Sequence, residues 1–131
     1  HKFFAQNMFN FITQTYPDFL NPNWTVCPIP LHWIRKLQRG FNQSEILSSL
    51  FPNKQLLLRR TKYTIPQAKL NKKTRQNNVK SAFQYQKQFV APAQVLLIDD
   101  VCGSGSTLDA GALTLKNAGV KKVWALVLAR N

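Results

Sequence analysis

A run of four apolar residues that leads into two aspartates and a glycine- and serine-rich loop constrains the fold of this chain more than any other feature. Val95-Leu-Leu-Ile98 is followed by Asp99 and Asp100, and the loop is expected to run from Val101 to Ser106. A continuous apolar run of this length is typical of a strand that is buried on both faces of a parallel sheet. Because open α/β sheets bind ligands at the carboxyl ends of their strands, the sequence predicts a ligand site here.

The residues after this loop complete a β-loop-α-β unit. Thr107 to Ala118 has apolar residues on one side at helical spacing, and Gly119 suits the left-handed cap that ends a helix. Val123 to Ala129 is a second apolar strand. Units of this kind cross over with a right hand and leave the loop at the carboxyl edge of the sheet.

The length of 131 residues suits one domain over residues 1–131, with a single core. Further patterns predict, in chain order, a helix over Phe3–Tyr16, a strand over Trp24–Ile29, a helix over Glu45–Leu50 that begins near Asn42 or Ser44, a strand at Leu56–Leu58 and a long, partly helical loop over Thr61–Lys80. The expected class is therefore α/β.

The chain is strongly basic. Lys and Arg number 18 against 5 Asp and Glu, which leaves a net charge of +13. Such an excess predicts anionic partners, which include phosphates, nucleic acid and membrane surfaces. The cations are unevenly placed, because no acidic residue occurs from Ile46 to Ile98 while ten of the 18 cations lie in that stretch.

Cysteine content and hydropathy favour a cytoplasmic protein. Cys27 and Cys102 are too few for a Cys-only zinc site, have no His at ligand spacing, and are expected to be reduced thiols. The apolar run Val123–Ala129 is far shorter than the roughly 20 residues that span a bilayer. No secretory signal pattern is visible, so we expect no stable membrane insertion.

The acidic pair and the loop have the chemistry of a sugar phosphate site. Asp99 and Asp100 can accept hydrogen bonds from vicinal sugar hydroxyls, and the loop glycines let the backbone approach a ligand closely. Backbone N–H groups at a helix start, together with Ser and Thr hydroxyls, form a phosphate cradle. The residues expected to form it are Cys102, Gly103, Ser104, Gly105, Ser106 and Thr107.

Two other phosphate motifs do not fit this loop. A Walker A loop has Lys before its Ser or Thr, where this chain has Ser106. A dinucleotide fingerprint has a third glycine where this chain has Leu108, and its acid follows the glycines by about twenty residues. A plain Gly-Ser turn before a helix, with Asp100 as its cap, remains the alternative.

The segment Val95–Leu108 resembles the motif that binds 5-phosphoribosyl-1-pyrophosphate (PRPP) in type I phosphoribosyltransferases. More narrowly, the chain is similar to the ComF family (ComFC/GntX-like), which is linked to natural competence and DNA uptake. The similarity includes Val26–Pro30, the string Arg39-Gly-Phe-Asn-Gln-Ser44 and spaced residues from Arg60 to Phe83. It implies a type I phosphoribosyltransferase-like fold, in which helices flank a mainly parallel sheet.

The resemblance also implies roles for particular residues. Asp99 and Asp100 would bind the ribose hydroxyls of PRPP, directly or through Mg²⁺, and Gly103 to Thr107 would hold the 5′-phosphate. The protein alone is not expected to bind a metal, and no catalytic residue is assigned. The loop after Pro30 would face the pyrophosphate and Mg²⁺, with His32, Arg35, Lys36 and Arg39 as its candidate ligands.

The chain departs from the family pattern at three points. Members usually begin with a cysteine-rich zinc module, and residues 1–131 contain none. Gly103-Ser104-Gly105 stands where the family usually has Thr-Thr-Gly, and the Ser104 hydroxyl can replace that of a threonine. Purine phosphoribosyltransferases have an acid/base aspartate at the position of Gly103, so purine salvage is disfavoured.

These features predict a PRPP-binding, ComF-like protein that assists DNA uptake and handles single-stranded DNA, with other competence proteins as further partners. One alternative is an active phosphoribosyltransferase of unknown acceptor in nucleotide metabolism, and another is a regulator whose DNA affinity responds to PRPP. Phe83, among the cations, is expected to be core rather than to stack on bases. The nucleic-acid candidates are Arg59, Arg60, Lys62, Lys69, Lys72, Lys73, Arg75 and Lys80.

Overall fold

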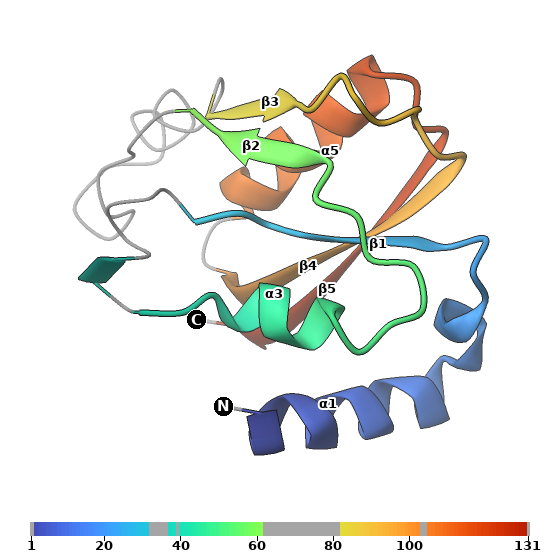
Figure 1. Cartoon of the computed structure of the whole chain (residues 1–131), viewed down its shortest axis with the longest axis vertical. Helices are drawn as coiled ribbons and strands as arrows, with labels where there is room; N and C mark the ends of the chain where they lie inside the picture. Colours follow the sequence, from blue (N-terminus) through green and yellow to red (C-terminus); the bar gives the residue numbers. More distant parts are fainter. Residues whose placement is uncertain (1, 32–36, 39, 62–81, 103–104, 131) are drawn as a thin grey trace.

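The computed structural model describes residues 2–31, 37–38, 40–61, 82–102 and 105–130. Its centre is a three-stranded parallel sheet in the order β1-β4-β5. Helices α1 and α3 lie on one side of this sheet, and helix α5 lies on the other with an antiparallel pair, β2–β3 (Figure 1). The strands are β1 (Thr25–Pro28), β2 (Leu58–Arg60), β3 (Phe83–Tyr85), β4 (Gln94–Cys102) and β5 (Lys122–Arg130). The helices are α1 (Lys2–Thr15), the 3-10 helix η1 (Pro17–Leu20), α3 (Gln43–Ser48) and α5 (Ser106–Asn117).

Strand β4 is the centre of the core because both of its faces are covered. Val95 and Leu97 pack into a cluster with α5 and the β2–β3 pair. Leu96 and Ile98 pack into a second cluster with α1, α3 and η1. None of these four side chains is more than 1% exposed. The predicted strand that is buried on both faces is therefore confirmed.

Strand β4 continues further than the sequence predicts. Its parallel register with β5 pairs Asp99 with Val127 and Val101 with Ala129, and it ends at Cys102. The expectation that a loop begins at Val101 is wrong, because the apolar length of β5 offers backbone partners beyond the apolar run of β4. Both aspartates consequently lie within a strand, close to its end.

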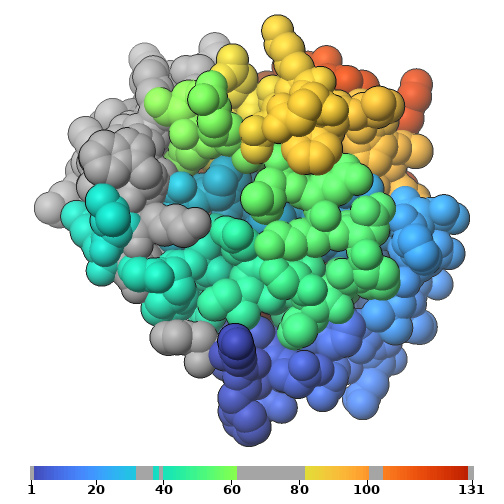
Figure 2. All heavy atoms as spheres, viewed as in Figure 1, coloured from blue at the N-terminus to red at the C-terminus, as the bar shows by residue number. Residues whose placement is uncertain are grey.

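The segment that leads from α3 to β2 joins the sheet at β1, the edge strand opposite β5. The Val26 N–H donates to the Asn53 carbonyl at 2.8 Å, and the Gln55 N–H donates to the Val26 carbonyl at 3.0 Å. This segment (green) spreads over the surface between α1 and the β3 region (Figure 2). It covers β1, where Cys27 is a buried free thiol whose pKa is raised by burial to about 11.

The β2–β3 pair differs from the predicted strand at Leu56–Leu58. Leu57 and Leu58 are buried, as their apolar character requires, but the strand ladder runs from Leu58 to Arg60. Its partner, Phe83–Tyr85, lies beyond residues 62–81, and local patterns do not reveal pairing over such a separation. The central sheet is parallel as predicted, and this pair adds an antiparallel element. Residues 62–80 of the predicted long loop lie outside the described residues.

Helix α5 ends at the predicted glycine. The Gly119 N–H donates to the Lys116 carbonyl and the Val120 N–H donates to the Leu115 carbonyl, both at 3.1 Å. This pair of bonds is a Schellman motif, and the buried side chains of Leu115 and Val120 belong to the same core cluster. The motif turns the chain from α5 into β5. In the described part of the chain, no helix combines the length and apolarity needed to cross a bilayer.

Replacement of Gly119 by Ala should destabilise the fold by about 1–2 kcal/mol, because an L side chain is strained at its φ of 115°. The added Cβ would meet Ala91 at 3.4 Å, an ordinary contact, so backbone strain is the cause. Urea unfolding should show a lower midpoint with an unchanged slope. Gly119→Asn should lose less, because Asn tolerates positive φ better. Equal stability of Gly119→Ala and the parent would contradict this account.

Candidate functional site

The acidic pair and the start of α5, which are parts of the predicted ligand site, lie at the carboxyl edge of the parallel sheet. Strand β1 ends at Pro28, which is in register with Ile98 of β4. The Ile29 N–H donates to the Ile98 carbonyl at 2.8 Å, so the chain leaves β1 beside the first aspartate. Helix α5 begins shortly after β4 ends. The sheet edge therefore brings the acidic pair next to the segment that follows β1.

Asp99 is a buried carboxyl with an altered affinity for protons. Its side chain is 8% exposed, and its pKa is raised from 3.8 to about 7. Burial is the main cause, and the negative charge of Asp100 adds to it. The Asp100 N–H donates to Asp99 Oδ1 at 2.9 Å, which opposes the shift, as does the charge of Arg60. A carboxyl in this state changes charge near neutral pH.

Helix α5 begins with a glycine in the left-handed conformation. Gly105 has a φ of 83° and is the N-cap residue of α5. A Cβ at Gly105 would meet nothing within 4 Å, which means that backbone conformation rather than space requires glycine. Ser106 and Thr107 form the first turn and are partly buried. Gly103 and Ser104 lie outside the described residues, and the structure describes only the backbone of Cys102.

Arg60, one of the predicted nucleic-acid candidates, reaches the segment that follows β1. Its Nη1 donates to the Pro30 carbonyl at 3.5 Å, and its guanidinium carbon lies 5.1 Å from the centre of the Phe83 ring. Its charge also acts on Asp99. The signal that was missed is strand alternation: Arg59 and Arg60 are neighbours in β2, so one of the two must face inward.

Of the remaining nucleic-acid candidates, the structure describes only Arg59. Arg59 is exposed and its Nη2 donates to Gln84 Oε1 at 2.7 Å. Phe83 is core, as expected, at 7% exposed. Two sets of candidates lie outside the described residues. They are Lys62, Lys69, Lys72, Lys73, Arg75 and Lys80 of the nucleic-acid set, and His32, Arg35, Lys36 and Arg39 of the pyrophosphate loop.

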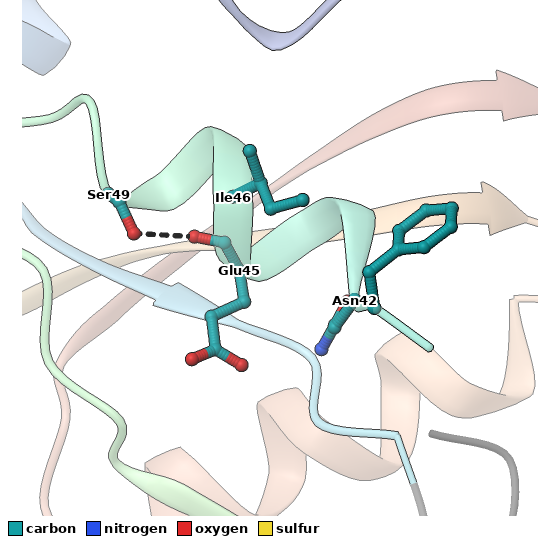
Figure 3. A pocket seen from close by; sticks show the side chains of 5 residues that line it. Asn42, Glu45, Ile46 and Ser49 are labelled. Carbon is teal, nitrogen blue, oxygen red and sulfur yellow. Dashed lines mark hydrogen bonds between the residues drawn. The ribbon is translucent and has the colours of Figure 1, made fainter. Parts of the chain in front are cut away.

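A hollow of about 230 Å³ lies beside α3 (Figure 3), and its lining does not include the acidic pair. Its lining residues are Phe41, Asn42, Glu45, Ile46 and Ser49. Asn42, within the Arg39–Ser44 string, has a structural role because its side chain joins two elements. Its Nδ2 donates to the Ile29 carbonyl at 3.1 Å, and its Oδ1 accepts from the Ser44 N–H at 3.1 Å. This residue caps α3 and ties it to the end of β1.

The geometry defines an α/β protein in which an acidic pair, a left-handed glycine and a helix start lie at the carboxyl edge of a parallel sheet. No protein-family model matches the chain. The chain is 34% identical over 113 residues to competence protein F of Haemophilus influenzae (strain Rd), and this match covers 80% of the chain and 49% of that protein. It is 32% identical over 111 residues to the DNA utilization protein YhgH of Escherichia coli K12, which covers 77% of the chain and 48% of that protein.

The chain therefore belongs to the ComF family, as the sequence resemblance predicted. A protein of Shigella flexneri, also called DNA utilization protein YhgH, matches to the same extent. The chain spans about half the length of the curated relatives it matches.

The pKa of Asp99 predicts a pH dependence of stability. Because the folded-state pKa of about 7 exceeds the ordinary 3.8, the folded chain binds more protons than the unfolded chain between these values. The free energy of unfolding should therefore fall as pH rises from about 4 to about 7. Asp99→Asn resembles the neutral carboxyl, so it should remove this fall. It should be more stable than the parent at pH 8, by at most about 4 kcal/mol.

Urea unfolding at pH 5 and pH 8 measures this difference. The matched control is Asp109→Asn, which removes the same charge from an exposed position in the first turn of α5. It should leave the pH dependence as in the parent. A parent chain whose stability does not fall between these pH values, or an Asp99→Asn variant that keeps the fall, would contradict the assignment.

Proposed function

We propose that this chain binds PRPP, or a related phosphoribosyl compound, at the carboxyl edge of its parallel sheet, and that it does so as part of DNA uptake. The observation that supports this most is the acidic pair. A chain with a net charge of +13 has many cations but places adjacent carboxylates, one of them buried, beside the start of a helix. Sugar hydroxyls are good donors to such carboxylates.

The chemistry of each part fits one portion of the ligand. Asp99 and Asp100 accept hydrogen bonds from the ribose hydroxyls. The segment from Gly103 to Thr107 contributes amide and hydroxyl donors to the 5′-phosphate, because the first N–H groups of a helix have no acceptor within the helix. Each charge-assisted bond contributes roughly 1.5–3 kcal/mol, so a few of them hold a phosphate firmly.

Magnesium fits this site as a companion of the ligand. The carboxylates of Asp99 and Asp100 offer the hard oxygen atoms that Mg²⁺ prefers. Within the described residues, no group of three His, Cys, Asp or Glu side chains is arranged to hold a metal ion. Ligand oxygen atoms would therefore complete the shell, and the ion would neutralise charge on the pyrophosphate.

A type I phosphoribosyltransferase-like fold is part of this proposal. It is supported by the parallel order β1-β4-β5, by the site at the strand ends and by the antiparallel pair on one side. Turnover is a separate question. Because Gly103 has no side chain to act as acid or base, binding without purine transfer is favoured over a purine salvage enzyme. An active transferase with another acceptor is the second candidate.

Single-stranded DNA is the proposed macromolecular partner. The names of the relatives refer to competence and to DNA utilization. The stretch from Ile46 to Ile98 has ten cations and no acid. A positively charged surface of this kind tracks a phosphate backbone. Phe83 is buried in the core, so any stacking on bases would fall to other aromatic residues.

Isothermal titration with PRPP and Mg²⁺ tests the ligand. The parent chain should bind, and the Asp99→Asn plus Asp100→Asn variant should bind at least about tenfold more weakly, since it loses charge-assisted bonds to the hydroxyls. The control Asp109→Asn should bind as well as the parent or better, because it removes a negative charge near the phosphate. Absence of binding by the parent, or unchanged binding by the double variant, would overturn the proposal.

Salt titration of single-stranded DNA binding tests the partner. The logarithm of the affinity should fall linearly with that of the salt concentration, with a slope of about −0.7 for each phosphate that the chain neutralises. Replacement of Lys72, Lys73 and Arg75 by Gln should make the slope shallower by about 2, which corresponds to three lost contacts. Affinity that does not respond to salt would exclude this role.

A further inference from the structure

We propose that Arg60 is a positioning residue of the candidate ligand site, which joins the β2–β3 pair to the carboxyl edge and places a fixed cation beside Asp99. The inference deepens the proposed function and rests on it for the identity of the ligand. It separates Arg60 from the basic residues that serve nucleic acid.

The position of Arg60 in β2 directs its side chain inward. Arg60 is in register with Phe83, which is buried, and Arg59 is in register with Gln84, which is exposed. The pair continues to a hydrogen bond from the Thr61 N–H to the Ala82 carbonyl at 2.8 Å. Two adjacent arginines therefore have opposite environments because side chains alternate along a strand.

Two contacts hold the guanidinium in place, and its charge acts on a neighbouring carboxyl. It lies over the Phe83 ring, it donates to the Pro30 carbonyl, and its charge acts on the Asp99 carboxyl. Among the described residues, Asp100 and Arg60 are the charged groups that act on Asp99. A planar guanidinium makes stacked and forked contacts at once, which an ammonium group cannot do. Arg60 thus contacts β3 and the segment after β1, and its charge acts on Asp99 of β4.

The location next to Pro30 points to the anionic end of a ligand. The chain that follows Pro30 contains the cations expected to face a pyrophosphate, and the acid pair faces the sugar. Arg60 donates to the Pro30 carbonyl and its charge acts on Asp99, so it would set the position of the segment after β1 relative to the acidic pair. A residue that tracks a nucleic-acid backbone stays exposed and solvated instead, as Arg59 does.

A ligand-free measurement tests the positioning role by itself. The Asp100 N–H donates to Asp99 Oδ1, so its NMR signal reports where that carboxyl lies. Arg60→Gln should shift this signal, while the matched control Arg59→Gln, which removes the same charge from the same strand, should not. Arg60→Lys should shift it less, because it keeps the charge. An Asp100 signal that is the same in Arg60→Gln as in the parent overturns the proposal.

Binding measurements with PRPP, Mg²⁺ and single-stranded DNA complete the test. Arg60→Gln should weaken PRPP binding by about tenfold, because the segment after β1 and the acidic pair lose the cation that positions them, and should leave the salt slope for DNA unchanged. Arg60→Lys should recover part of the affinity, and Arg59→Gln should bind PRPP like the parent. Failure of the parent to bind PRPP would remove the proposed ligand but not the positioning role. A shallower DNA slope in Arg60→Gln, with normal PRPP binding, would return Arg60 to the nucleic-acid set. If Arg60→Gln does not fold, Arg60→Lys decides between these outcomes.

Discussion

A carboxyl group at the end of a fully buried strand is the constraint on which the rest of this structure depends. The four residues before Asp99 are covered on both faces, and Asp99 continues the same strand into the same low-exposure environment. An ionised group there loses hydration, and the neighbouring Asp100 increases the penalty. A neutral residue would be the stable choice for folding alone. The presence of acids at this point is therefore best understood through what they bind.

The surrounding elements hold this costly group by short, specific links. Asn42 fastens α3 to the end of β1 through the Ile29 carbonyl, and Arg60 fastens the β2–β3 pair to the next segment through the Pro30 carbonyl. Both links reach the chain immediately after β1, from opposite layers of the sheet. A site built in this way is positioned by the core rather than by its own loops, which suits a ligand site that must be ready before the ligand arrives.

Local sequence patterns predicted the buried part of β4, and the end of α5, from a few adjacent residues each. The apolar run before Asp99 and the glycine after α5 were both interpreted correctly, because burial on two faces and a left-handed cap leave direct marks in the sequence. The length of β4 and the β2–β3 pair left no such mark. They depend on β5 and on Phe83, which lie far along the chain. Alternation alone indicates that one of Arg59 and Arg60 faces inward. It does not say which one, because that depends on the register of β2 with β3.

Arg59 and Arg60 are adjacent in β2 but lie in different surroundings, and in the proposals above they serve different anions. Both have the same charge, and a count of cations treats them alike. In the fold, one is solvated beside Gln84, and the other lies on an aromatic ring beside a buried acid. A solvated cation interacts with any phosphate backbone and is screened by salt, whereas a partly buried and oriented one is suited to a ligand of a given shape. Under the proposed function, selectivity for a small sugar phosphate over excess nucleic acid would come from that difference in surroundings rather than from the net charge.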